Sequence, residues 1–147
     1  MTATSKKPIC TIDADGTESW TLNGYMHRED GPAFIRPDVG YTQWNKNGAI
    51  HRLDGPAVMY PGGERWYKHG KLHRLGGPAV TKPDGTQIWY VKDLMHRTDG
   101  PALMRGDGTV EWYLHGKRIT HASRFQHRTH FSDEYIAMLV LTFGKIQ

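Results

Sequence analysis

Four segments of the chain repeat one pattern at nearly constant spacing, and this repetition constrains the fold more than any other feature. Each segment runs from a Trp to a His-Arg pair and on to Gly-Pro-Ala; the His always lies seven residues after the Trp, and the Gly four residues after the His. Successive His residues are 24, 22 and 23 residues apart, and all of this variation falls between Gly-Pro-Ala and the next Trp. A fixed module therefore alternates with a surface turn that tolerates insertions. The Trp residues are Trp20, Trp44, Trp66, Trp89 and Trp112, the last of which begins a unit without His-Arg or Gly-Pro-Ala.

Two kinds of turn sequence occur in each unit. Three and four residues after the Trp stands a pair such as Asn-Gly, which is the strongest signal for a two-residue hairpin turn because both of its residues adopt positive φ. Lys92-Asp93 departs from this pattern, and we expect it to strain or widen its turn. The pairs are Asn23-Gly24, Asn47-Gly48, His69-Gly70, Lys92-Asp93 and His115-Gly116. The opposite turns are marked by Asp38-Val39-Gly40, Gly62-Gly63, Asp84-Gly85 and Asp107-Gly108.

Alternating side chains favour strands over helices. In the segment "ERWYK", Trp66 and Tyr67 point to opposite faces, because successive side chains in a strand do so. Two chain reversals per unit of about 23 residues then predict a mostly β protein, a single-layer antiparallel meander of about five β-hairpin repeats with about two strands each.

The repeats also define the domain organisation. We assign residues 1–15 to an N-terminal segment, residues 16–118 to the repeat array and residues 119–147 to a C-terminal cap. The cap is expected to contain a helix near 133–143, because Ser132 is a good N-cap, acidic residues follow it and a glycine lies at the far end. Such a helix would cover the last strand of the array.

The unit W-x-x-N-G-x-x-H-R-x-D-G-P-A, followed by a Pro-Asp-Gly turn, resembles a MORN-type repeat. The resemblance covers roughly residues 16–118, and it is to a variant found in bacterial and phage proteins that include some toxin-neutralising antitoxins. The Trp residues match the aromatic position of such repeats, while His-Arg and Gly-Pro-Ala replace the usual glycine-rich end. The resemblance implies a single-layer repeat sheet that serves as a scaffold or partner-binding surface, sometimes with lipid contacts. It does not imply catalysis.

The four His-Arg pairs have two interpretations. As a functional row they would bind phosphates, acidic side chains or a nucleotide, because both side chains donate hydrogen bonds to anions. As part of the scaffold, each Arg would pair with the Asp two residues later, and each His would hydrogen-bond the backbone of the next repeat. Four copies with one spacing favour the scaffold interpretation. The pairs are His27-Arg28, His51-Arg52, His73-Arg74 and His96-Arg97.

The third pair breaks the rule, because Gly76 stands where the other units have Asp. Arg74 is therefore expected to lack its acidic partner. It becomes the arginine that we expect to be free for a ligand, with His73 beside it.

The aromatic residues form two columns. The Trp column is expected to be the buried face of the meander, given the area that an aromatic side chain buries. A Tyr column is confined to the later units, and it either packs against the C-terminal helix or contacts a partner. The candidate partner-binding residues are Tyr67, Tyr90, Tyr113, His73, Arg74 and Lys92, and the expected scaffold consists of the five Trp residues with His27, Arg28, His51, Arg52, His96 and Arg97.

Composition narrows the function. The 147 residues include one cysteine, Cys10, and neither an apolar run long enough to cross a membrane nor a signal-peptide core, so a cytoplasmic location is expected. Residues 16–118 contain 14 Lys or Arg against 11 Asp or Glu, spread along the span, which does not predict a polyanion-binding stripe. Neither catalysis nor a cofactor is expected, because Cys10 has no evident base and no phosphate-binding glycine motif occurs. No metal is expected at His121, His127 and His130, which lack the further ligands of a zinc site.

The expected function is a non-enzymatic binding module that acts on another protein, for example by occluding it. By analogy with the repeat class, a neutralising protein such as an antitoxin or a phage-encoded inhibitor of a host factor suits a small basic repeat array. The alternative is nucleic-acid or nucleotide binding through the His-Arg row and the Tyr column, which a steep salt dependence would reveal. Membrane binding is not expected, because no segment is basic enough. The open edges of such a sheet would also allow a homodimer.

Overall fold

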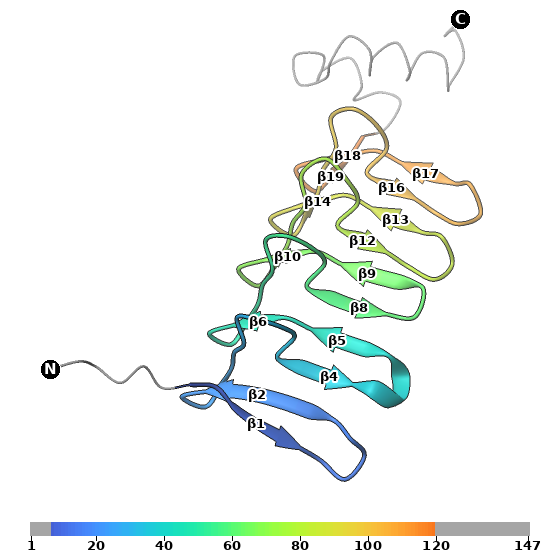
Figure 1. Cartoon of the computed structure of the whole chain (residues 1–147). Coiled ribbons are helices and arrows are strands. Elements are labelled where there is room, and N and C mark those ends of the chain that lie inside the picture. The colour runs from blue at the N-terminus through green and yellow to red at the C-terminus, as the bar shows by residue number, and fades with distance from the viewer. Residues whose placement is uncertain (1–6, 120–147) are drawn as a thin grey trace, which may run out of the picture.

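The computed structural model describes residues 7–119, which form a ladder of stacked β-hairpins (Figure 1). All strand pairings in this part of the chain are antiparallel, and its helical content is one 3-10 turn, η1 (Pro37–Val39). The prediction of a mostly β antiparallel meander is confirmed. The predicted helix near 133–143, and all of the predicted cap except Ile119, lie outside the described residues.

The largest element is an eleven-stranded sheet, called here the main sheet. Its path follows the chain, because each hairpin pairs with the hairpin of the next unit. Its strands are β1 (Ile9–Ile12), β2 (Glu18–Leu22), β3 (Tyr25–Met26), β4 (Phe34–Arg36), β5 (Tyr41–Gln43), β8 (Val58–Tyr60), β9 (Gly63–Arg65), β12 (Val80–Thr81), β13 (Gln87–Ile88), β16 (Leu103–Met104) and β17 (Val110–Glu111).

Four further two-stranded sheets, called here the short hairpins, line one side of the main sheet (Figure 1). Each repeat therefore contributes four short strands, and the prediction of about two strands per repeat is wrong. The short hairpins are β6 (Asn45–Lys46) with β7 (Ala49–Ile50), β10 (Tyr67–Lys68) with β11 (Lys71–Leu72), β14 (Tyr90–Val91) with β15 (Leu94–Met95), and β18 (Tyr113–Leu114) with β19 (Lys117–Arg118).

The Trp residues lie where the main sheet passes into the short hairpins. The backbone N–H of Trp44 donates to the carbonyl of Ala57 at 2.7 Å, which continues the main sheet. The carbonyl of Trp44 accepts from the N–H of His51 at 3.0 Å, which closes the short hairpin. The same two bonds recur at Trp20, Trp66 and Trp89. Trp44, Trp66 and Trp89 each separate a main-sheet strand from a short-hairpin strand, whereas β2 runs through Trp20.

The hairpin turns have the predicted backbone conformation. Asn47 and Gly48 have φ values of 50° and 82°, and even Lys92 and Asp93 have values of 52° and 68°. The Lys92-Asp93 turn is not widened, because Val91 still pairs with Leu94 across a two-residue loop. A carboxylate helps to hold this conformation, since Asp93 Oδ1 accepts a hydrogen bond from the N–H of Leu72 at 2.8 Å.

The buried core is a row of alternating large and small residues. The strand register, continued by one residue, sets Ala33 between Trp20 and Trp44, and each later Gly-Pro-Ala alanine between two Trp residues in the same way. The alanines Ala33, Ala57, Ala79 and Ala102 are fully buried. A small residue is needed here, because neighbouring strands are only about 4.8 Å apart and an indole extends over its neighbour.

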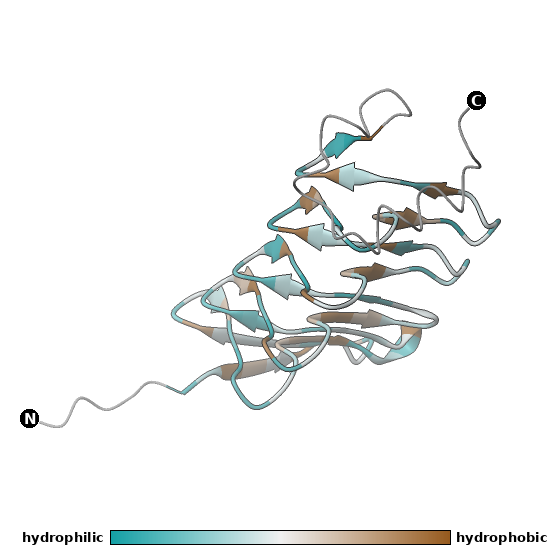
Figure 2. Ribbon diagram, turned by 90° about the horizontal axis from the view of Figure 1, so that it is seen from above, coloured by the Kyte–Doolittle hydropathy of each residue, from teal (hydrophilic) through white to brown (hydrophobic). Residues whose placement is uncertain are grey.

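The Trp column is less buried than predicted. Trp112 is buried, but the other four indoles stay partly exposed, because no second sheet layer covers them within the described residues. Hydrophobic residues instead gather along the strands of the main sheet, while most loops at its margins are hydrophilic (Figure 2). The partly exposed Trp rings therefore have the loops of their own repeat as their remaining cover.

Candidate partner-binding surface

Each complete repeat carries a loop that runs from His-Arg to Gly-Pro, called here the His-Arg loop (residues 27–32, 51–56, 73–78 and 96–101). The Arg of each loop stacks on the Trp of its own unit. The guanidinium carbon lies 4.1 Å from the ring centroid for Arg28 on Trp20 and 3.9 Å for Arg74 on Trp66. Such a cation–π contact covers the indole without a second layer.

The rest of the motif holds this guanidinium in place. Arg52 Nε donates to Asp54 Oδ1 at 2.9 Å, and Arg52 Nη1 donates to the Pro56 carbonyl at 3.3 Å. A Cβ added at Gly55 would lie 2.8 Å from the guanidinium carbon, which explains why a glycine occupies this position. The H-R-x-D-G-P motif thus places the Asp carboxylate, the Gly and the Pro carbonyl around the guanidinium of its own arginine.

The predicted Arg to Asp ion pairs are present in the three units that have the Asp. The distances are 2.8 Å for Arg28 to Asp30, 2.9 Å for Arg52 to Asp54 and 2.8 Å for Arg97 to Asp99. The hydrogen bond from Arg28 holds the pKa of the Asp30 carboxyl below its ordinary value, and the bond from Arg52 does the same for Asp54.

The predicted His contacts are also present. The ring Nδ1 of His51 accepts a hydrogen bond from the N–H of His69, the first turn residue of the next unit, at 3.0 Å. The ring of His73 accepts from the N–H of Lys92 in the same way at 3.3 Å. Because Nδ1 accepts, the neutral imidazole must carry its proton on Nε2. The His row therefore links successive repeats.

Arg74 is not free, so that prediction is wrong. Its Nη1 lies 3.5 Å from Glu64 Oε1 and donates to the Pro78 carbonyl at 3.0 Å. Glu64 also accepts from Trp66 Nε1 at 3.0 Å, two residues further along the chain. A carboxylate from β9 thus replaces the aspartate that Gly76 removes, and the sequence gives little signal for it because the two residues lie ten positions apart.

Open grooves lie between consecutive His-Arg loops. Each is lined by one Trp, by the residue two positions after it, and by an Arg from each loop. The first groove has a volume of about 440 Å³ and includes Arg28, Trp44, Lys46, Arg52 and Leu53. The second has a volume of about 460 Å³ and includes Arg74, Leu75, Trp89, Val91 and Arg97.

Two leucines at the rims of these grooves were missed by sequence reasoning. Leu53 and Leu75 occupy the variable position of H-R-x-D in the second and third loops, and they are 71% and 76% exposed. Leucines this exposed, at equivalent positions of consecutive repeats, are typical of an interaction surface. The available signal was a leucine directly after His-Arg in both units, where the first unit has Glu29.

The Tyr column lies on the other face of the strands from the Trp column. Tyr67, Tyr90 and Tyr113 are half-buried, and burial raises the pKa of Tyr90. Tyr113 donates to Glu111 Oε2 at 2.9 Å. The prediction that these residues bind a partner stays a prediction.

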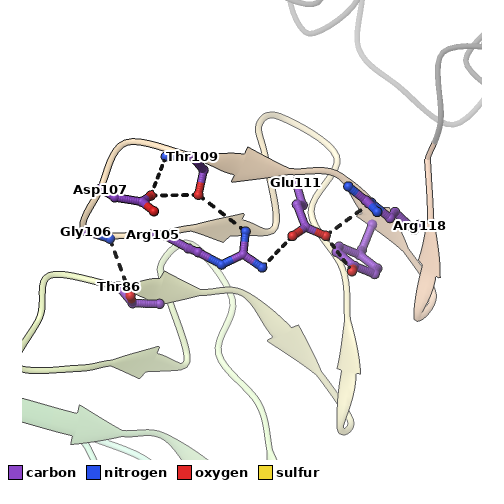
Figure 3. Close-up of polar contacts among 8 residues, drawn as sticks. Thr86, Arg105, Gly106, Asp107, Thr109, Glu111 and Arg118 are labelled. Carbon is purple, nitrogen blue, oxygen red and sulfur yellow. Dashed lines mark hydrogen bonds and ion pairs between the residues drawn. The ribbon is translucent and has the colours of Figure 1, made fainter.

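Glu111 is the centre of a charged cluster at the last hairpins of the described array (Figure 3). It accepts a short hydrogen bond from Arg105, and Arg118 Nε lies 3.2 Å from Glu111 Oε2. The bond from Arg105, the bond from Tyr113 and the charges of both arginines hold the pKa of the Glu111 carboxyl below its ordinary value. This carboxylate is therefore committed to linking the main sheet with the last short hairpin.

The remaining candidate sites are the three C-terminal histidines and Cys10. His121, His127 and His130 lie outside the described residues. Within residues 7–119, no group of three His, Cys, Asp or Glu is placed to hold a metal ion, and Cys10 is a free thiol on β1. None of the helical segments in this range is long and apolar enough to cross a membrane.

Comparison with known proteins gave no match: no family model, no curated protein and no solved structure is significantly similar to this chain. The resemblance to MORN-type repeats therefore rests on the motif spacing alone.

Proposed function

We propose that this protein is a non-enzymatic binding module that acts by protein–protein interaction, and that the partner contacts the side of the array formed by the His-Arg loops. One observation carries the proposal. Leu53 and Leu75, at the rims of grooves that contain Trp44 and Trp89, give this side exposed apolar area on a hydrogen-bonded scaffold. Apolar anchors bordered by arginine are typical of the centres of protein interfaces.

The scaffold contacts support this choice over the nucleic-acid alternative. Arg52 and Arg97 already use Nε for aspartate and one Nη1 hydrogen for a proline carbonyl, and one face of each guanidinium lies on a Trp ring, so a phosphate would have to bind the remaining Nη hydrogens. The His rings use Nδ1 for the next repeat. A neutralising role, such as that of an antitoxin or a phage-encoded inhibitor of a host factor, agrees with a rigid array of this kind, and it rests on the analogy of repeat class.

The test is affinity capture from native host cells, followed by titration of the purified partner. The variant Leu53→Asp/Leu75→Asp is expected to weaken binding at least about tenfold, because it places charge where apolar area is buried. The matched control is Val39→Asp, which changes an exposed residue (46%) in the opposite turns. Equal binding by wild type and the double variant would contradict the proposal, and the variant Tyr67→Ala/Tyr90→Ala/Tyr113→Ala tests the Tyr face in the same assay.

A salt titration of the captured complex distinguishes protein binding from the alternative function, nucleic-acid binding. Binding through phosphates would weaken by about a thousandfold or more between about 50 and about 200 mM salt, whereas a complex anchored by leucines changes much less. A steep loss, with nucleic acid recovered in place of protein, would replace the proposal with the alternative.

A further inference from the structure

The fold separates charges that are mixed along the sequence. The four short hairpins (residues 45–50, 67–72, 90–95 and 113–118) hold six Lys or Arg against one Asp. The rest of residues 7–119 holds nine Lys or Arg against twelve Asp or Glu. The short hairpins thus carry a net charge of +5, and the remainder of the described array carries −3. This separation depends on the fold, because the breaks at Trp44, Trp66, Trp89 and Trp112 place the short hairpins on one side of the main sheet.

These basic side chains point into solvent. All six are exposed, and they are Lys46, Lys68, Lys71, Lys92, Lys117 and Arg118. Within the described part of the chain, two of them have an acidic partner: Lys46 Nζ lies 3.5 Å from Glu29, and Arg118 lies 3.2 Å from Glu111. The other four lysines have no ion pair within residues 7–119.

The lysines are close enough to act together. Lys46 and Lys68 occupy equivalent positions in consecutive units, which places them about 10 Å apart, since each unit adds two main-sheet strands at about 4.8 Å each. Lys68 and Lys92 both lower the pKa of His73 through their positive charge, in addition to the larger effect of burial. The four short hairpins therefore present one positive field, which attracts negative charge along their length.

The apolar neighbours of this field point to a protein and not to a nucleic acid. Leu53 lines the same groove as Lys46, and Leu94 on the third short hairpin is 47% exposed. Binding to single-stranded nucleic acid uses exposed aromatic side chains on which bases stack. Tyr67, Tyr90 and Tyr113 are half-buried. Among the described residues one tyrosine is largely exposed, Tyr25, which packs beside Gly48 of the first short hairpin, so this side offers a single exposed tyrosine and not one in each repeat.

We propose that the short hairpins are a docking surface for an acidic, partly apolar segment of the partner protein, with carboxylates bound by the lysines and apolar side chains against the leucines. This inference rests on the proposed protein-binding function and adds the chemistry of the partner. Carboxylates spaced about 10 Å apart would match the repeat, and a helix provides this spacing at every seventh residue.

The experiment measures binding of labelled probes to the full-length protein by fluorescence anisotropy. The probe is a synthetic peptide of about 20 residues in which Glu recurs at every seventh position beside Leu, and a second peptide has Gln in place of Glu. The first variant is Lys68→Gln/Lys71→Gln/Lys92→Gln, and the matched control is Lys82→Gln, an exposed lysine outside the short hairpins. Circular dichroism melts show that each variant is folded.

The wild type is expected to bind the Glu peptide at least about tenfold more tightly than the Gln peptide at low salt. The triple variant should lose most of that difference, and Lys82→Gln should keep it. Equal binding of both peptides, or equal loss in the control, would overturn the inference. Tighter binding of a single-stranded oligonucleotide of about 20 nucleotides, lost in the same triple variant, would overturn it in favour of nucleic acid.

The same variant separates this inference from the proposed function. If the native partner binds wild type and Lys68→Gln/Lys71→Gln/Lys92→Gln equally, while Leu53→Asp/Leu75→Asp fails to bind, the protein-binding function stands and the acidic docking surface does not. If no variant changes the binding, both fall.

Discussion

The guanidinium carbon of Arg97 lies 4.0 Å from the centroid of the Trp89 ring, and the two residues are eight positions apart. Trp89 covers one face of the guanidinium, and Gly100 is so close to it that an added Cβ would lie 2.5 Å away. Nε and Nη1 of Arg97 donate hydrogen bonds to Asp99 and to the Pro101 carbonyl, respectively. Each complete repeat is thus folded around one arginine, and this explains how a thin sheet keeps its Trp residues covered.

This arrangement predicts that a glycine is required at position 55 because the Arg52 guanidinium packs directly against it. Gly55→Ala should expel the Arg52 side chain from its stack, since the added Cβ would lie 2.8 Å from the guanidinium carbon. The expected loss in the free energy of unfolding is about 1–2 kcal/mol, the usual value of a cation–π contact with its hydrogen bonds. Urea denaturation of Gly55→Ala, Arg52→Ala and the double variant measures the coupling. Additive losses would contradict the explanation.

Much of this unit could be predicted from sequence, because its contacts are short in range and repeated. The positive φ of Asn47-Gly48, the pairing of Arg52 with Asp54 and the bond from the next turn to His51 all follow from fixed spacings. Glu64 could not be assigned to Arg74, because that contact joins a strand to a loop that returns beside it ten residues later.

The charged side of the array could not be predicted for a different reason. The charge of residues 16–118 is nearly balanced as a whole, although residues 65–83 hold five Lys or Arg and no Asp or Glu, and Lys46, Lys68 and Lys92 lie more than 20 positions apart. They are brought together only because the strand breaks at Trp44, Trp66 and Trp89 and the next six residues form a short hairpin on one side. The hydrogen bonds of the Trp backbone show this strand break, and the sequence pattern alone does not.

The alternating core predicts that the buried alanines resist enlargement. Ala79→Val should lower the free energy of unfolding by about 1–3 kcal/mol, because Ala79 is fully buried between Trp66 and Trp89. The control is Ala49→Val in β7, a partly exposed strand position where a β-branched residue is tolerated. Thermal melts of both variants give the comparison, and equal melting temperatures would argue against the tight Trp–Ala row.

The His row predicts a loss of stability in mild acid. Burial, together with nearby positive charge, lowers the pKa of His51, His73 and His96 below 6.5, so the folded protein binds fewer protons than the unfolded chain. The stability is fully present above the unfolded value of about 6.5, and it falls as the pH drops through the lower folded values. Urea midpoints measured from pH 7.5 to pH 5 should therefore decrease.

The variant His51→Asn/His73→Asn/His96→Asn tests the cause of this decrease. Asn offers an acceptor close to the position of Nδ1 but does not titrate, so the variant should fold and show a weaker dependence on pH. An unchanged dependence would mean that other groups produce the acid sensitivity.

The Lys92-Asp93 turn predicts a conflict between stability and binding. Lys92 has a φ of 52° without the side chain that favours this conformation, whereas Asn23 and Asn47 hold the same position in other units. Lys92→Asn should therefore raise the free energy of unfolding by about 0.5–1 kcal/mol, because Asn adopts the left-handed conformation more easily. The same change removes one of the exposed lysines, so affinity for the Glu peptide should fall. Lys68→Asn is the control, since it removes a lysine from a strand and should lower both quantities. If Lys92→Asn melted below the wild type, the turn would be stabilised by a lysine contact and not strained by its backbone.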